Sequence, residues 1–124
     1  MIDIKEYERS EIIERHLQDF INELLHLRGY SRNEDYQDHL KRLIRQNLKM
    51  LKQVQRQQRE IRDTIGAIRD ERYSRLLTLR YIKHKPQQEI SEIMCYERSY
   101  IAQLQKEALK AYQNAYISNG GNTK

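Results

Sequence analysis

The side chains best suited to chemistry follow the tripeptide Cys95-Tyr96-Glu97. If a helix begins at Arg98 and buries the apolar positions 101, 104 and 108, five side chains point outward: Arg98, Ser99, Ala102, Gln103 and Lys106. Arginine pairs with guanine edges, glutamine pairs with adenine, and an alanine methyl can meet the thymine methyl. This set predicts a surface that reads the bases of double-stranded DNA.

A second group of polar side chains flanks that helix and is suited to the DNA backbone. Basic, amide and hydroxyl groups donate hydrogen bonds to phosphate oxygens. The predicted phosphate contacts are Lys83, His84, Lys85, Gln88 and Tyr100. Tyr100 is equally suited to packing. The alternative for both groups is that they are ordinary solvated positions.

The elements that must position these residues are short helices. Residues 70–82 predict a helix with Leu76, Leu77, Tyr81 and Ile82 available for a core. A basic loop follows at 83–86, with Pro86 suited to the first position of a helix over 87–94. That helix turns Ile90, Ile93 and Met94 inward. Residues 95–97 form a three-residue turn before a helix from 98 to about 112, which is the helix-turn-helix arrangement.

The amino-acid sequence of this segment resembles that of a known protein family. Its features are Leu79-Arg80-Tyr81-Ile82, Glu89 to Met94, Tyr96, Ser99-Tyr100-Ile101, Leu104 and Ala108-Leu109. Residues 70–112 resemble region four of bacterial sigma factors, and more specifically the ArpU/RinA-like late-transcription activators of phages and prophages. The resemblance implies a transcriptional activator at a promoter, with host RNA polymerase as a candidate partner. Gln87, Cys95 and Glu97 depart from that pattern, where Trp, Gly and Ser are common, and Cys95 in a left-handed turn costs about 1 kcal/mol.

The N-terminal half predicts two long helices. A first helix over 4–28 carries a heptad seam at Ile13, Leu17, Phe20, Leu24 and Leu27. Ser31 or Asn33 can cap a second helix over about 34–70. Its seam consists of Leu40, Ile44, Asn47, Leu51, Val54, Gln58, Ile61, Ile65 and Ile68. The predicted fold is therefore all-α, a long helical hairpin or coiled coil followed by a C-terminal helix-turn-helix domain.

Three segments follow from these elements: an oligomerisation or partner-binding arm at 1–69, a DNA-binding domain at 70–117 and a disordered tail at 118–124. The second seam is longer than the first, so the part from about Leu51 onward needs another partner. A second copy of the chain is the simplest choice, which predicts a homodimer. A hairpin and a parallel dimer use the same seam residues, however, so periodicity alone does not separate them.

Charge is distributed unevenly. Residues 1–35 contain five Lys or Arg against nine Asp or Glu, and residues 36–124 contain eighteen against nine. The basic run along the second helix is interpreted first as the solvated face of a coiled coil. Tracking of a nucleic-acid backbone and pairing with the acidic first helix are the alternatives. The basic C-terminal part favours a polyanionic partner.

Other chemistry has little support. His16, His26, His39 and His84 lack the spacing of a metal site, and Cys95 has no partner base and is expected to be a packed thiol. We expect no catalytic residue, metal, cofactor or small-molecule substrate, so the protein is predicted not to be an enzyme. With one cysteine, no secretory signal and no apolar run of membrane-spanning length, a bacterial cytoplasmic location is expected and no membrane partner.

The leading functional hypothesis is a dimeric, sequence-specific DNA-binding regulator, acting as a late-gene activator as the resemblance implies. One alternative is a DNA-packaging protein similar to a small terminase subunit. The other is a coiled-coil protein-interaction module whose helix-turn-helix is merely structural, which the acidic first helix supports.

Overall fold

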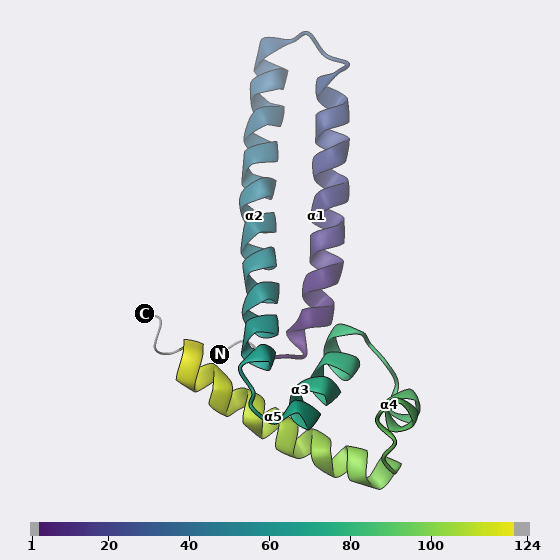
Figure 1. Ribbon diagram of the computed structural model, residues 1–124. Helices are drawn as coiled ribbons and strands as arrows, with labels where there is room; N and C mark the ends of the chain where they lie inside the picture. The colour runs from purple at the N-terminus through teal and green to yellow at the C-terminus, as the bar shows by residue number, and fades with distance from the viewer. Residues whose placement is uncertain (1–2, 121–124) are drawn as a thin grey trace. The chain divides into compact units, whose positions relative to one another are not determined.

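A computed structural model describes residues 3–120, with side chains through 117. These residues form helices α1 (Glu6–Arg28), α2 (Glu34–Gly66), α3 (Glu71–Leu77), α4 (Gln87–Met94) and α5 (Arg98–Gly120), and a π-helical turn η1 (Thr78–Ile82). The all-α prediction is confirmed, since this part of the chain contains no strand (Figure 1). None of its helices combines the length and apolar character that crossing a membrane requires. The chain divides into two compact units, residues 9–58 and residues 1–8 with 59–124.

The 9–58 unit is an antiparallel hairpin of α1 and α2 (Figure 1). Asn33 ends the connecting loop as the N-cap of α2, where its Oδ1 accepts a hydrogen bond of 2.9 Å from the Tyr36 amide. Gln37 closes the same end, because its Nε2 donates to the Arg28 carbonyl at 2.8 Å. These bonds fix the register in which the two helices pair.

The contact stripe of α1 differs from the predicted one. Leu17 and Leu24 do face α2, but Ile13, Phe20 and Leu27 are exposed. The stripe instead runs through Ser10, Glu14, Leu17, Ile21 and Leu24, at alternating spacings of four and three. Polar members are possible because Gln55 and Gln58 donate to the Glu14 carboxylate at 3.0 Å and 3.3 Å. For the first helix only apolar residues were predicted in the seam, and this is where the prediction was wrong.

The predicted seam does lie on the inner side of α2, except for Ile68, which follows the end of the helix at Gly66. Six of its nine members are buried and the other three half-buried. Its polar members are satisfied inside the chain: Asn47 donates to the Leu43 carbonyl at 2.7 Å, and Gln58 binds Glu14. Because the seam residues are buried or half-buried within one chain, the outer part of the seam does not require a second copy, and its use as an oligomerisation surface stays a prediction.

The outer part of that seam belongs to the other compact unit, residues 1–8 with 59–124, here termed the C-terminal unit. Ile61 and Ile65 join a core that includes Leu76, Ile90, Ile101, Leu104 and Tyr112. The N-terminal Ile4 and Tyr7 enter the same core, and Arg62 Nη1 donates to the Tyr7 hydroxyl at 2.8 Å. The compact units therefore separate between Gln58 and Arg59, rather than at the expected boundary after Arg69.

Two predicted helices have different lengths in the structure. The second ends at Gly66 instead of 70, and Asp70 caps α3, accepting from the Arg72 amide at 2.9 Å. The third predicted helix is split into α3 and η1, because the backbone amide of Lys83 donates to the Thr78 carbonyl at 2.9 Å across a π-helical turn. Leu76 and Leu77 are buried as predicted, Tyr81 and Ile82 are half-buried, and the unpredicted Leu79 is buried.

The last helix is longer than predicted. α5 continues from Arg98 through Gly120, and residues 115 and 116 are still half-buried beyond the expected end at about 112. Disorder was predicted for 118–124. Residues 118–120 are the last three of α5, and residues 121–124 lie outside the described residues.

Candidate nucleic-acid interface

Helices α4 and α5 are joined by three residues, as predicted. The Tyr96 amide donates to the Ser91 carbonyl at 3.2 Å, and the Ser91 hydroxyl returns a hydrogen bond to the Tyr96 carbonyl. The first residues of the two helices also meet, since Gln87 Nε2 donates to the Arg98 carbonyl at 3.2 Å. Pro86 is the N-cap of α4, one position before the predicted place. The start of α5 is thereby held from two sides.

Cys95 ends α4 in the left-handed conformation, with φ 59° and ψ 41°. Its amide donates to the Ser91 carbonyl, so the turn closes as a helix C-cap usually does. The side chain is exposed, and its Sγ donates only to the Glu92 carbonyl at 3.7 Å. The prediction that Cys95 is a packed thiol is therefore wrong, because the side chain of a residue in this turn projects away from the core.

Replacing Cys95 with glycine should stabilise the protein. A side chain costs about 1 kcal/mol in the left-handed region, and the greater freedom of glycine in the unfolded chain offsets part of that gain. We expect Cys95→Gly to raise the melting temperature by about 2–4 °C in thermal unfolding followed by circular dichroism. Cys95→Ala keeps the Cβ and should leave the midpoint unchanged. An equal rise in both variants would contradict the strain argument.

All five predicted base-facing residues, Arg98, Ser99, Ala102, Gln103 and Lys106, are exposed. At 100° per residue they occupy an arc of about 140° on α5. The opposite side of the helix is buried, with Ile101 and Ala108 at 0% and Leu104 at 1% exposure. α5 therefore presents one continuous polar side from its first turn.

The residues predicted to contact phosphates lie on a loop and two helices, and they differ in exposure. Lys83, His84 and Gln88 are exposed, and His84 has a positive φ of 56°. Lys85 is half-buried and pairs with Glu89 at 3.4 Å, so its charge is partly neutralised. Lys83 and Lys85 line a hollow of about 600 Å³ together with Arg75. Ile93 also lines it and is exposed, which corrects its predicted place in the core.

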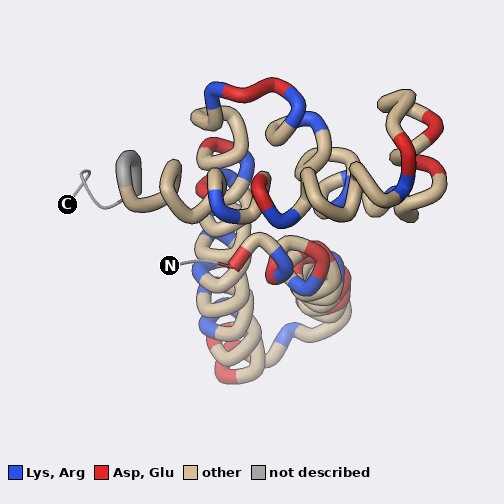
Figure 2. The backbone as a smooth tube through the Cα atoms, turned by 90° about the horizontal axis from the view of Figure 1, so that it is seen from below, with Lys and Arg blue, Asp and Glu red and all other residues tan. Residues whose placement is uncertain are grey.

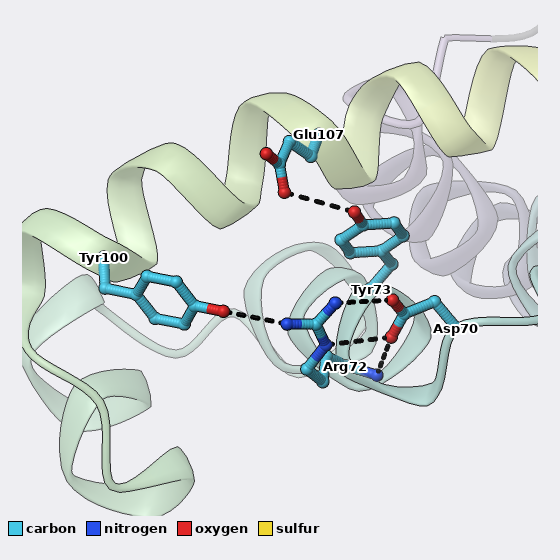
Figure 3. A network of polar contacts seen from close by, with 5 residues as sticks. All are labelled: Asp70, Arg72, Tyr73, Tyr100 and Glu107. Carbon is cyan, nitrogen blue, oxygen red and sulfur yellow. Dashed lines mark hydrogen bonds and ion pairs between the residues drawn. The ribbon is translucent and has the colours of Figure 1, made fainter.

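Tyr100 has a structural role in this arrangement. Its hydroxyl accepts a hydrogen bond of 2.8 Å from Arg72 Nη1, and its ring packs edge-on against Tyr96 with centroids 4.8 Å apart. These contacts agree with the packing role predicted for Tyr100, and its contact with a phosphate stays a prediction. Figure 3 shows that Arg72 reaches from α3 toward the first turn of α5.

Arg72 is held in turn by Asp70. Its Nη2 lies 2.8 Å from Asp70 Oδ2, and its Nε donates to Oδ1 at 3.2 Å. The hydrogen bonds from Arg72 lower the pKa of the Asp70 carboxyl, and those from Asp70 raise the pKa of Arg72. Desolvation and the bond to Glu107 raise the pKa of Tyr73, whose hydroxyl donates to Glu107 at 3.1 Å. Polar bonds thus fasten α3 to α5 at two places (Figure 3).

The sequence did not reveal two of the residues that position the site. Gln87 was noted only as a departure from the family pattern, yet it links the starts of α4 and α5. Arg72 was not singled out, although it connects Asp70 with Tyr100. The available signal for Arg72 was its place two residues after a capping aspartate, and nothing local indicated that Tyr100 would lie beside it.

Comparison of the chain with protein-family models, with curated proteins and with solved structures finds no match.

Proposed function

We propose that this protein is a non-enzymatic, sequence-specific DNA-binding regulator in which α4, the 95–97 turn and α5 act as a helix-turn-helix. One observation carries the proposal: the exposed side of α5 begins at its first turn and consists of side chains that can read base edges, while the opposite side is anchored in a core. The N-terminal part of α5 would enter the major groove.

The surroundings of α5 support the same function. Arg72, Gln87 and the Ser91–Tyr96 bonds hold its first turn, so Arg98, Ser99 and Gln103 are presented from a fixed helix rather than from a loop. Holding a recognition surface in place before binding reduces the ordering cost on association. Lys83 and His84 are exposed in the preceding loop and are proposed to bind phosphates.

The biological role is proposed from the family resemblance of residues 70–112. We propose a phage or prophage late-gene activator in the bacterial cytoplasm that binds at a promoter as a dimer, with host RNA polymerase as its second partner. The test is selection of bound duplexes from random DNA by the full chain, repeated from about 50 to 200 mM salt. A recovered motif supports the proposal, whereas weak binding without a motif, lost as salt rises, contradicts it.

The phosphate contact has its own test. A lysine that neutralises one phosphate contributes about 0.9 to the slope of log K against log salt concentration. We expect Lys83→Ala to reduce that slope by about this amount on duplexes of any sequence. Lys49→Ala, an exposed lysine of α2, should leave the slope unchanged. The reverse result would favour α2 as the element that tracks the DNA backbone.

A further inference from the structure

One flank of the hairpin in the 9–58 unit is apolar and uncovered. Beside the contact stripe, large apolar side chains recur every seven residues on both helices. They are Ile13, Phe20 and Leu27 of α1 and Tyr36, Leu43 and Met50 of α2, here termed the apolar flank. Leu43 is half-buried, and the other five are 38–46% exposed. Such a periodic stripe is typical of a surface that another helix covers.

The two halves of this flank form one surface. An antiparallel helix pair has a local two-fold axis normal to the plane of the helices, so equivalent flanking heptad positions lie on the same side. Contacts of Glu14 with Gln55 and of Arg28 with Gln37 set the register. In that register Phe20 lies level with about Met50, and Leu27 lies between the levels of Tyr36 and Leu43. The opposite flank is mostly polar, with Leu25 and Leu48 as exposed apolar exceptions.

The size of the apolar flank fits a dimer interface. Aromatic side chains bury about 150–250 Å² each and aliphatic ones somewhat less, so the six side chains at roughly two-fifths exposure present about 400 Å². A standard interface buries about 800 Å² per partner, a little over half of it apolar. The apolar flank therefore supplies the apolar part of one standard interface, and the polar residues beside it would supply the remainder.

The charges indicate which partner covers it. Between residues 39 and 58, α2 carries six exposed cations and no carboxylate: Lys41, Arg42, Arg45, Lys49, Lys52 and Arg56. In Figure 2 the Lys and Arg positions of the backbone are blue and the Asp and Glu positions red. Residues 9–28 of α1 have four carboxylates against three arginines. At 100° per residue, the six cations of α2 lie on the side of the helix away from the apolar flank, and the residues that border the flank are the uncharged Gln46, Gln53 and Gln57. A second copy of this flank can therefore approach it without like-charge repulsion.

We propose that the apolar flank docks on the same flank of a second copy, forming a four-helix bundle in which each α1 packs on the partner's α2. The two-fold axis then runs parallel to the helices. The alternative pairing of α2 with α2 would place both sets of six cations on one side of the bundle, whereas this pairing places them on opposite sides, where they repel each other less. Both chains leave this bundle at the same end, after Gln58. The use of such a dimer to read two half-sites rests on the proposed function, but the dimer itself does not.

The first test measures the mass of the full chain in solution by analytical ultracentrifugation. We expect a dimer for the unaltered protein and a dissociation constant raised about 30-fold or more by Phe20→Glu or Met50→Glu, since each buries a carboxylate in an apolar interface. Leu48→Glu is the matched control: Leu48 is 42% exposed against 46% for Met50, but lies on the opposite flank. It should remain dimeric. Circular dichroism verifies that all variants keep their helices.

A mixing experiment tests the pairing of α1 with α2. Phe20→Glu and Met50→Lys should each be monomeric alone, because each places a charge on the apolar flank of both copies. Mixed at equal amounts, they should form a one-to-one dimer, since the introduced carboxylate then faces the introduced amine of the other chain. Failure of the mixture to associate would overturn this arrangement of the helices.

Two other outcomes would overturn the inference altogether. One is a monomeric unaltered chain at every accessible concentration, and the other is a dimer that survives both Phe20→Glu and Met50→Glu. DNA binding is measured separately, on a duplex with a single half-site. A monomeric Phe20→Glu variant that still binds it supports the dimer surface and leaves the proposed function intact. Loss of single-site binding in the unaltered chain would count against the function alone.

Discussion

The Arg98→Ala, Gln103→Ala double variant should lose most of its sequence-specific DNA binding while keeping its fold. A good bidentate contact to a base contributes about 1–3 kcal/mol of discrimination, so two such contacts contribute about 2–6 kcal/mol. Specific affinity should fall by about 30-fold or more, because each 1.4 kcal/mol is tenfold. The side chains are exposed, so the melting temperature should hardly change.

The measurement is titration of the selected motif and of a scrambled duplex at one salt concentration. Affinity for the motif should fall toward that for the scrambled duplex, which the double variant should bind nearly as well as the unaltered chain. Gln113→Ala is the control, since Gln113 is exposed on the same side of α5, about four turns farther along. Unchanged discrimination in the double variant would show that α5 does not read the bases.

The outward side of α5 could be predicted because its signal is local. An apolar residue at 101, 104 and 108 fixes which side of one helix is buried, and all five residues predicted on the other side are exposed. The left-handed turn residue was expected from the family resemblance, in which Gly is common where this chain has Cys95, and Cys95 does adopt that conformation. What these side chains bind remains a prediction.

The contact stripe of α1 could not be predicted in the same way, because two stripes compete on one helix. The predicted stripe and the observed one share Leu17 and Leu24 and differ by a small rotation. The predicted stripe is the more apolar, so periodicity favours it. The observed stripe is selected by the partner helix, where Gln55 and Gln58 satisfy Glu14. Hydrogen bonds between segments so far apart in the sequence cannot be predicted from the local pattern of apolar residues.

The division of the chain depends on packing of the same long-range kind. The heptad pattern of α2 continues without interruption through Gln58, Ile61 and Ile65, so it predicts one arm. The partners of that seam change along the helix: Gln58 binds Glu14 of α1, whereas Ile61 packs with the core of the C-terminal unit. A uniform pattern can therefore serve two units, and only the three-dimensional contacts show where one ends.

Ile61→Ala should destabilise the C-terminal unit although it lies in the helix of the hairpin. Ile61 is 1% exposed and packs in the core that contains Leu76 and Ile101. Truncating a buried isoleucine to alanine costs about 2–5 kcal/mol through lost burial and a residual cavity. That is a large part of the 5–15 kcal/mol that typically stabilises a domain. Urea denaturation of the full chain should show a lower midpoint.

Hydrogen exchange locates the effect. Amides of α3, α4 and α5 should exchange faster in Ile61→Ala, while those between residues 9 and 58 should change less, because local stability follows the cooperative unit. Leu48→Ala truncates an exposed leucine of the same helix and should shift stability by less than about 0.5 kcal/mol. If exchange instead accelerates mainly in residues 9–58, then Ile61 stabilises the hairpin, and the boundary between units lies beyond α2, as the heptad pattern alone predicts.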